Sequence, residues 1–505
     1  MGSDRTHLAS TTSLCPTCLD PVPGRYEARD GAVHLARTCP DHGPSSRQVW
    51  GSVEHWEWAG SFGPDVAGDP DASGAAGGDD GGAADADADA GASDGPGGEG
   101  ADPPIDPATD LTVDDDHACL AVVEVTEDCN LSCSYCFASS GPGGRHRPFD
   151  EVIDLLEVVR SGAGPRPVQF SGGEPTVRDD LPALIERAAG MGFDHVQVNT
   201  NGLRLAREDG YAERLADAGL AAVYLQFDGL DPGTYEALRE VDLTGEKRAA
   251  VAACRRADLP VVLVPTVVPG VNDDEMGDVV RFALDNRDVV QSVNFQPVAH
   301  FGRYERNDGR FSLDRAAEAL ADGLDALDAR DLLPVPCCSS YCQLATALLP
   351  DGDGGAVPLT GFLSPSAFDA LAGSIDEADW LELLAGTPAG GATACTAADC
   401  CGLDAAVPGD AGDILDAVLP VSITGFMDAD AADAERLDNC CISVPTPDGD
   451  LVPFCAYNMT TEDGRYALRE RGGWGGRPAV GEPGRPEGDE PAADGSSPPS
   501  AAGGG

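Results

Sequence analysis

The sequence predicts an α/β protein with parallel strands, flanked by two cysteine-rich regions. Between Cys119 and about Arg330, short apolar runs alternate with helical patterns, which is typical of strand–helix units. Cysteine and histidine cluster near the N-terminus, and nine further cysteines follow Arg330. A chain of 505 residues is long enough for two or three domains with packed cores.

We expect five regions along the chain. They are a small metal-binding domain (1–62), an acidic disordered linker (63–116), a strand–helix core (117–330), a cysteine-rich extension (331–470) and a disordered tail (471–505). The linker contains no aromatic residue, lysine or arginine, so it cannot bury enough apolar surface to offset the entropy of ordering. The extension has weak periodicity, and we expect irregular structure organised by metal rather than by a large core.

The metal-binding domain carries a C-x2-C-x20-C-x2-H pattern. Its four candidate ligands are Cys15, Cys18, Cys39 and His42. Two short knuckles separated by a hairpin, each donating two ligands to one tetrahedral ion, build a rubredoxin-like or zinc-ribbon site. The metal is zinc or a single iron. Iron would relay electrons, whereas zinc would only stabilise a domain too small to fold alone.

Six apolar runs of the core are typical of buried parallel strands, at 119–125, 167–170, 195–199, 221–227, 260–268 and 290–298. Helical spacing of apolar residues, mostly after an Asp or Asn suited to an N-cap, occurs at 149–162, 178–192, 208–219, 246–258 and 272–286. This order implies either a partial barrel or a doubly wound sheet.

Three cysteines follow the first predicted strand directly. Cys129, Cys133 and Cys136 form a C-x3-C-x2-C motif. Barrel folds build active sites at the carboxyl ends of their strands. Three thiolates from one short loop can hold three irons of a 4Fe-4S cluster, which leaves the fourth iron open to a substrate or cofactor. A pure electron carrier would prefer four cysteines.

The segment from Cys129 to Cys136, CNLSCSYC, resembles the cluster-binding loop of radical S-adenosylmethionine (SAM) enzymes. The resemblance implies a partial (βα)6 TIM-type barrel and a 4Fe-4S cluster whose open iron is chelated by SAM. In that superfamily, one electron from the cluster breaks the sulfonium C–S bond of SAM. The 5'-deoxyadenosyl radical that results takes hydrogen from an unactivated carbon. Tyr135 matches the aromatic residue that is common before the last cysteine.

The resemblance also implies which residues contact SAM. Gly172, Gly173, Glu174 and Pro175 match the GGEP element, which meets the amino group of the cofactor. Glycine lets a backbone approach a ligand closely, and a carboxylate suits an ammonium. Further expected contacts lie at the ends of later strands, at Asn199, Thr200, Asn201, Gln226, Asp228 and Gln296. Taken singly, each of these positions is also compatible with an ordinary turn or helix cap.

The C-terminal cysteines have two interpretations. They are Cys337, Cys338, Cys342, Cys395, Cys400, Cys401, Cys440, Cys441 and Cys455. A zinc-stapled extension with leftover thiols is one interpretation. Adjacent Cys-Cys pairs are unusual in zinc knuckles, because neighbouring thiolates rarely point at one tetrahedral ion, so we favour auxiliary 4Fe-4S clusters.

The whole arrangement resembles archaeal tetraether lipid synthases and their relatives, some described as methyltransferases acting on a dihydropterin. The likeness covers residues 14–57 and 119 to about 460. It implies, first, C–C bond formation on isoprenoid lipid chains with peripheral membrane contact, and second, methyl transfer to a dihydropterin-like small molecule. A non-catalytic electron carrier is the third hypothesis. Either enzyme needs a reductive electron donor.

Composition limits the partners of the protein. The formal net charge of -55 makes binding to a nucleic-acid backbone untenable. No apolar run reaches the length of a membrane span, and the first ten residues lack the features of a signal peptide, so we expect a cytoplasmic protein. We interpret the acidic excess as a solvated coat that suits a halophilic source.

If the acidic excess is a solvated coat suited to high salt, we predict that the protein keeps its fold in multimolar KCl and loses it in dilute buffer. Self-repulsion of the acidic coat is screened when the Debye length falls to about 3 Å at 1 M salt. Circular dichroism of the purified chain across a KCl series measures this effect. A fold and activity equally stable in dilute buffer would contradict it.

Overall fold

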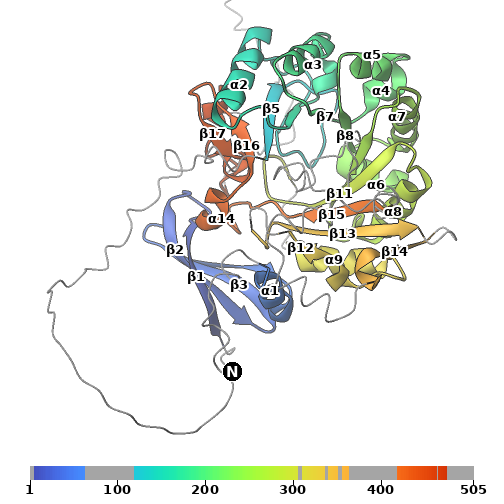
Figure 1. Ribbon diagram of the computed structural model, residues 1–505. Helices are drawn as coiled ribbons and strands as arrows, with labels where there is room; N and C mark the ends of the chain where they lie inside the picture. Colours follow the sequence, from blue (N-terminus) through green and yellow to red (C-terminus); the bar gives the residue numbers. More distant parts are fainter. Residues whose placement is uncertain are drawn as a thin grey trace, which may run out of the picture.

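The computed structural model describes residues 5–62, 119–304, 310–335, 339–350, 355–362, 418–462 and 464–474 (Figure 1). The predicted linker at 63–116 and nearly all of the predicted tail lie outside the described residues. So do five of the predicted C-terminal ligands, Cys337, Cys338, Cys395, Cys400 and Cys401.

The N-terminal domain is a four-stranded antiparallel sheet followed by one helix. Its strands pair in sequence order and are β1 (Thr6–Leu14), β2 (Pro21–Arg29), β3 (Ala32–Cys39) and β4 (Gly43–Trp50), and the helix is α1 (Val53–Gly60). Asp30 and Gly31 both have positive φ and make the tight turn between β2 and β3. The expected hairpin between the two knuckles is therefore present.

The core contains the six predicted parallel strands. They are β5 (Leu120–Thr126), β6 (Val168–Gly172), β7 (Val196–Thr200), β8 (Ala222–Gln226), β9 (Val261–Val264) and β11 (Val290–Pro297), with a short β10 (Thr266–Val267) beside β11. They lie side by side in chain order. A doubly wound sheet reverses its strand order, so the partial-barrel prediction is confirmed and the alternative is wrong.

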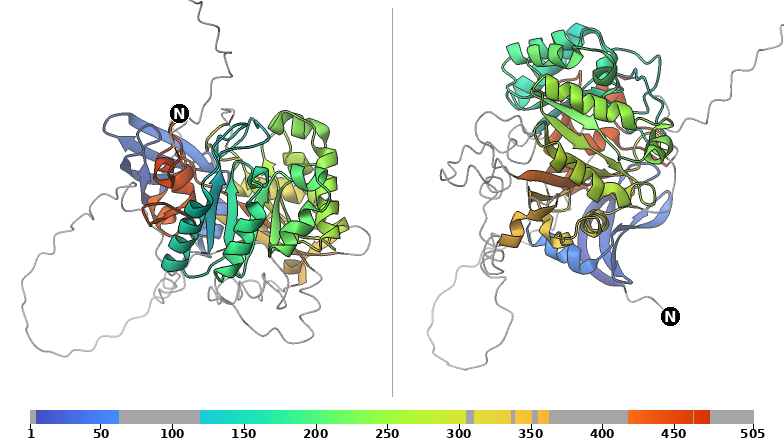
Figure 2. Two further views of the ribbon diagram at one scale, coloured as in Figure 1. Left: turned by 90° about the horizontal axis from the view of Figure 1, so that it is seen from above. Right: turned by 90° about the vertical axis from the view of Figure 1, so that its right-hand side faces the viewer.

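The helices cover the outside of this sheet (Figure 2). Those at predicted positions are α2 (Phe149–Gly162), α3 (Leu181–Gly190), α5 (Tyr211–Asp217), α7 (Thr244–Arg256) and α8 (Met276–Asp285). Three that the sequence analysis did not predict are α4 (Leu203–Arg207), α6 (Pro232–Arg239) and α9 (Leu313–Asp322). The expected N-caps are mostly absent: Asp180 precedes α3 without a side-chain cap bond, whereas Asp231 does cap α6.

The described part of the C-terminal extension corrects the expectation of irregular structure. It adds strands to both edges of the sheet: β12 (Leu333–Pro334), β13 (Gln343–Pro350), β14 (Ala356–Pro358) and β15 (Leu419–Thr424) beyond β11, and β16 (Ile442–Pro445) and β17 (Leu451–Pro453) beyond β5 (Figure 1). Leu419, Val421 and Ile423 of β15 belong to the main hydrophobic core. The extension is thus part of the barrel.

The two faces of β5 enter different cores. Val123 and Val125 pack beneath the helices, whereas Leu120 and Val122 point into the barrel and meet residues of the C-terminal extension such as Phe454. Phe454 begins α15 (Phe454–Asn458). This alternation follows from the period of two along a strand. The extension therefore fills one side of the barrel interior.

The N-terminal domain docks on the extension through buried hydrogen bonds. Tyr26 donates to Asp433, which caps α14 (Ala434–Asp438), at 2.5 Å between Oη and Oδ2. Arg37 is buried and donates from Nη2 to the backbone oxygen of Asp430 at 2.7 Å. Hydrogen bonds of this kind fix orientation because leaving such groups unpaired in the interior is costly.

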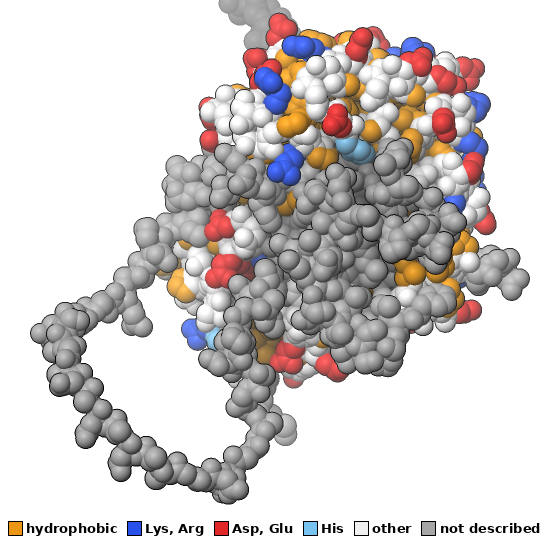
Figure 3. All heavy atoms as spheres, in the orientation of Figure 1, with side chains coloured by type: hydrophobic (Ala, Val, Ile, Leu, Met, Phe, Trp, Pro, Cys, Tyr) orange, Lys and Arg blue, Asp and Glu red, His pale blue; other side chains and the backbone are white. Residues whose placement is uncertain are grey.

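Acidic side chains are spread over the described surface in Figure 3, with arginines between them. Among the described residues, no helix is long and apolar enough to cross a membrane.

A buried ion pair joins the barrel to the end of the described extension. Glu124 of β5 accepts from Arg469 at 2.5 Å and from the Tyr457 hydroxyl at 2.9 Å. The side chains of Glu124 and Arg469 are 4% and 7% exposed. Because neither charge reaches water, each depends on the other.

We predict that Glu124→Gln lowers the free energy of unfolding by about 3–5 kcal/mol, because it leaves the Arg469 guanidinium buried without its counter-charge. The matched control is Glu157→Gln, which breaks the exposed pair with Arg160 and costs roughly 0–1 kcal/mol. Denaturant unfolding of both variants in one buffer compares them. Equal losses would contradict the role assigned to Glu124.

Candidate functional site

The three cysteines of the C-x3-C-x2-C motif line a cavity at the carboxyl ends of the strands. The cavity has a volume of about 220 Å³. Other predicted site residues that line it are Tyr135, Gly172, Gly173, Glu174, Asn199, Thr200, Asn201, Gln226 and Gln296. Pro175 and Asp228 do not line it and are buried behind it. The structure thus brings most of the predicted set together around one space.

The cluster loop, which we define as residues 127–141, is held by its backbone. The Cys136 N–H donates to the Arg303 carbonyl at 2.8 Å, and the Arg303 N–H donates back at 2.9 Å. The Arg303 side chain donates to the Cys133 carbonyl at 2.5 Å and to the Ser140 carbonyl at 3.0 Å. The segment after β11 therefore clamps the loop without using the thiols.

A second arginine holds the middle of the cluster loop. Arg239 of α6 donates from Nη1 to the Tyr135 carbonyl at 2.9 Å. Two other nitrogens of the same guanidinium donate to Asp228, at 2.8 and 2.6 Å. Burial alone would raise the pKa of Asp228, but Arg239 outweighs it and holds this pKa below its usual value. Asp228 therefore orients Arg239 as a carboxylate.

Two of the three thiols of the motif are buried enough to resist ionisation. Burial raises the pKa of Cys129, and the nearby Glu174 carboxylate raises it further. Burial also raises the pKa of Cys133, although Arg239 opposes this. Thiolate is the form that binds iron, so cluster insertion must release protons from these groups.

Gly172, the last residue of β6, and Gly173, which follows it, pack against the backbone at the end of β5 and the start of the cluster loop. A Cβ at Gly172 would lie 2.2 Å from the Thr126 carbonyl oxygen, and Gly172 has φ +118. A Cβ at Gly173 would lie 2.2 Å from the Asp128 carbonyl oxygen. From the sequence, we expect these glycines to let the backbone approach a ligand closely. In the structure, the close approach is to the protein backbone, and only glycine permits it.

Glu174 uses both carboxylate oxygens inside the protein. Oε1 accepts from the Thr176 hydroxyl at 2.6 Å and the Thr200 hydroxyl at 2.7 Å, and Oε2 accepts from the Asn201 N–H at 2.7 Å. The residue is 1% exposed. It ties the end of β6 to the end of β7. Contact of Glu174 with an ammonium of SAM stays a prediction.

The described residues show a second wall that the sequence analysis did not predict. It contains Phe137, Phe301, Tyr304, Phe426 and Phe454, from the cluster loop, the segment after β11 and the extension. The ring centroids of Phe137 and Phe454 are 5.8 Å apart, and those of Phe426 and Phe454 are 5.2 Å apart. The phenylalanine after Cys136 and the one before Cys455 were visible signals, but only the fold brings them together.

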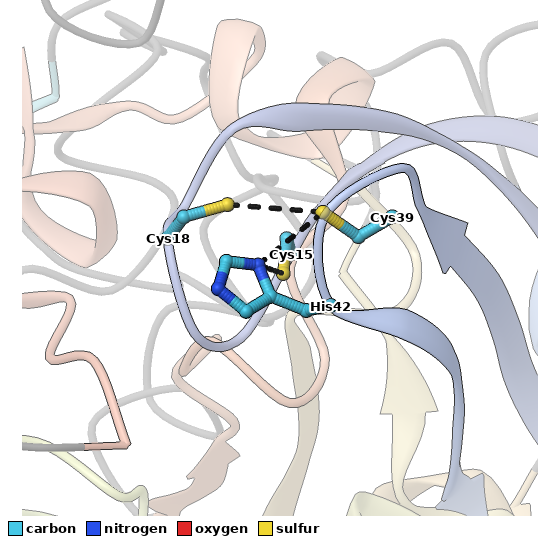
Figure 4. Close-up of side chains that lie close together, drawn as sticks. All are labelled: Cys15, Cys18, Cys39 and His42. Carbon is cyan, nitrogen blue, oxygen red and sulfur yellow. Dashed lines mark hydrogen bonds between the residues drawn. The ribbon is translucent and has the colours of Figure 1, made fainter.

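The N-terminal pattern converges on one point. The side-chain ligand atoms of Cys15, Cys18, Cys39 and His42 all lie within 4.8 Å of one another (Figure 4). His42 Nδ1 is 3.5 Å from Cys39 Sγ and 3.7 Å from Cys15 Sγ. Three sulfurs and one imidazole nitrogen at this spacing fit a single tetrahedral ion such as zinc.

Four of the predicted C-terminal ligands are described, and their surroundings differ. Cys342 Sγ accepts from the buried Arg436 guanidinium at 3.3 Å, and Cys455 Sγ accepts from the Met427 N–H at 3.4 Å. Cys440 and Cys441 precede β16. The described ranges contain no second group of ligands at single-ion spacing. Assignment of these residues to auxiliary clusters stays a prediction.

Comparison with known proteins agrees with this site. Residues 123–283 match the model of the radical SAM superfamily, and residues 7–51 match an HMPTM N-terminal zinc ribbon domain. A 7,8-dihydro-6-hydroxymethylpterin dimethyltransferase of Methanocaldococcus jannaschii is 31% identical over 495 residues, which cover 89% of this chain and 93% of that protein. The chain belongs to the radical SAM superfamily and carries the zinc ribbon of this group of enzymes.

Other relatives match a smaller part of the chain. A GTP 3',8-cyclase of Acidothermus cellulolyticus is 32% identical over 188 residues, which cover 35% of this chain and 51% of that protein. Among solved structures, Streptococcus suis SuiB matches with a TM-score of 0.35 and 17% identity, covering 41% of this chain and 46% of SuiB. The superfamily match and the relative that covers nearly the whole chain identify the protein as an enzyme that uses a 4Fe-4S cluster and SAM.

We predict that Cys39→Ser removes one equivalent of zinc per chain and leaves the iron content unchanged, because three ligands remain at the ribbon and none is lost at the cluster loop. The matched control is Cys254→Ser, which changes a buried cysteine of α7 that lies outside the quartet. Elemental analysis of both purified variants measures the metals. Full zinc retention in Cys39→Ser would contradict the assignment.

Proposed function

We propose that the protein is a radical SAM methyltransferase acting on a reduced pterin or a closely similar flat heterocycle. The observation that carries the proposal is a single cavity that is lined by the thiol triplet, by polar strand ends and by an aromatic wall. The full-length likeness to an enzyme named for a dihydropterin substrate supports the same class of substrate.

Each side of the cavity has a proposed role. Cys129, Cys133 and Cys136 hold three irons of a 4Fe-4S cluster, because a triplet of thiols at this spacing fits that group and leaves one iron for SAM. When bound, this cluster supplies the electron that cleaves SAM to methionine and a 5'-deoxyadenosyl radical. The proposed contacts of SAM are the cavity-lining residues of the predicted set, from the ends of β6, β7, β8 and β11.

The aromatic wall is suited to a planar ring. The Phe426 ring is tilted against the rings of Phe301 and Phe454, with centroids 6.4 and 5.2 Å apart. Tyr304 stacks on His300 with centroids 4.7 Å apart, and His300 lies within 3.8 Å of the buried Asp428 carboxylate. Flat heterocycles gain about 1–3 kcal/mol from stacking on such rings. This wall is the proposed seat of the substrate.

Lipid coupling stays a second candidate because one observation favours it. Leu120, Val122 and Ile442 lie in the cavity wall beside the phenylalanines, so that side is apolar enough for an isoprenoid chain. A lipid substrate would bring the protein into peripheral contact with a membrane. The two candidates differ in the polarity of the substrate and therefore in the products.

We also propose that the C-terminal cysteines hold auxiliary 4Fe-4S clusters that pass electrons toward the site from a reductive donor. Cys455 supports this placement, because it follows Phe454 of the cavity wall directly and is buried. Iron in excess of four per chain, lowered in Cys455→Ala while the SAM-cleaving site persists, is the expected result. Four irons per chain in the intact protein would contradict it.

Anaerobic reconstitution tests the proposed substrate. With dithionite, SAM and a separate one-carbon donor, which is needed because the SAM that is cleaved keeps its methyl group on methionine, we expect 5'-deoxyadenosine and a methylated product from a 7,8-dihydropterin, measured by mass spectrometry, and no product from an archaeal diether lipid. Cys133→Ala should abolish both 5'-deoxyadenosine and product. Coupled lipid chains with an unchanged pterin would overturn the proposal in favour of lipid coupling.

We predict that Phe454→Leu raises KM for the dihydropterin about tenfold, because the change removes a stacking ring while keeping an apolar side chain. Release of 5'-deoxyadenosine without substrate should stay near the level of the intact protein. The control is Phe282→Leu, which removes a ring of α8 that stacks on Phe227 outside the cavity. An unchanged KM in Phe454→Leu would show that the aromatic wall is not part of the substrate site.

A further inference from the structure

The chain contains one lysine, and that lysine is buried. Of 32 basic residues, only Lys247 is a lysine. It lies on α7 and is 1% exposed. Lysine is almost never fully buried unless it is paired, because moving an ammonium out of water is costly. A chain that uses arginine at its other basic positions therefore keeps a compact ammonium at this one site.

Lys247 bonds to the ends of two neighbouring strands. Its Nζ donates to the Asn201 carbonyl, directly after β7, at 2.6 Å. It also donates to Gln226 Oε1, at the end of β8, at 3.1 Å. Both acceptor residues line the cavity. The ammonium thus lies behind the cavity wall and joins two of its segments.

One polar connection runs from Lys247 to the first cysteine of the cluster loop. The Asn201 side chain donates from Nδ2 to Asn130 Oδ1 at 2.7 Å. Asn130 follows Cys129 directly. The Asn201 N–H is held by Glu174 at 2.7 Å. The position of the Asn201 backbone is therefore fixed by Glu174 on one side and by Lys247 on the other.

A second polar connection runs from Lys247 to the middle of the cluster loop. The Gln226 amide nitrogen donates to Asp228. Asp228 accepts from Arg239, and Arg239 donates to the Tyr135 carbonyl at 2.9 Å. Lys247 is thus the point at which two hydrogen-bond networks from the cluster loop meet.

An ammonium suits this position better than a guanidinium. It offers three donors from one point on a narrow stem, whereas a guanidinium is a wide planar fork. The position is also costly for a charge: burial lowers the pKa of Lys247 to about 8, although Asp228 opposes this and Arg239 adds to it. Tyr235, Glu174 and Cys133 also lie around the group.

We propose that Lys247 is a positioning residue of the radical site. It holds the ends of β7 and β8 in register with the cluster loop, so that Asn201 and Gln226 present a fixed wall to SAM. This inference rests on the proposed placement of SAM against these two residues. Lys247 does not itself line the cavity, so it acts through them.

Lys247→Met tests the proposal, because methionine keeps the length of the side chain and removes its donors. We expect four irons at the cluster loop to be retained and the affinity for SAM to fall about tenfold or more. KM for SAM should rise more than kcat falls. Equilibrium dialysis against SAM and electron paramagnetic resonance of the reduced protein measure binding. Affinity equal to that of the intact protein would overturn the proposal.

The matched control is Arg248→Met, which removes a cation from the exposed face of the same helix. It should bind SAM like the intact protein. Gln226→Leu separates the two proposals: weakened SAM binding in Gln226→Leu but not in Lys247→Met overturns the role of Lys247 alone. Unchanged SAM binding in Gln226→Leu overturns the placement of SAM against this wall.

The intact holoenzyme offers a test that needs no variant. A chain grown with 13C at the lysine Cε gives one side-chain resonance, which can only arise from Lys247. We expect that resonance to shift when SAM is added, because the wall that Lys247 holds becomes occupied. A resonance that does not move on saturation with SAM would overturn the proposal.

Discussion

The structure depends on the hydrogen bonds that hold one short segment, the cluster loop, in place. Three thiols of an eight-residue segment must point to one place while leaving a coordination position open, and thiols alone cannot order a backbone. Two arginines meet this requirement by donating to loop carbonyls, Arg303 from the segment after β11 and Arg239 from α6. Hydrogen bonds from charged donors are stronger than neutral ones, so these two arginines hold the loop without using its thiols.

The barrel supplies the frame for these arginines. Asp228 follows β8 and orients Arg239, while Glu174 follows β6 and fixes the end of β7. Several polar residues at strand ends therefore bond to protein groups as well as facing the cavity. Residues on the loops take part in the chemistry, and residues behind the loops hold them in position, as is usual in barrel enzymes.

The sequence predicted the barrel because its signal is local. Runs of apolar residues with regular helical segments between them locate all six strands, and parallel strands in chain order follow from their alternation. Helices α4 and α6 were missed because they are only five and eight residues long. The pairing of β15 with β11 was missed because it joins segments more than a hundred residues apart. Such contacts leave no pattern within either segment.

The sequence predicted many of the residues that line the candidate site, but not the hydrogen bonds among them. Spacing identified the thiol triplet and the N-terminal quartet, since ligands of one metal site recur at short, fixed intervals. Nothing in a single sequence shows that Glu174 is saturated by Thr176, Thr200 and Asn201, or that Lys247 is buried. The aromatic wall was hidden for the same reason, because its rings come from three separate segments.

We propose that the thiol triplet holds a cluster with one iron open to SAM. Electron paramagnetic resonance of the anaerobically reduced full chain, with and without SAM, tests it directly. We expect one component of the cluster signal to change shape when SAM is added, and this SAM-responsive component to disappear in Cys129→Ala. A spectrum that does not change on addition of SAM, or a SAM-responsive component that persists in that variant, would contradict the assignment.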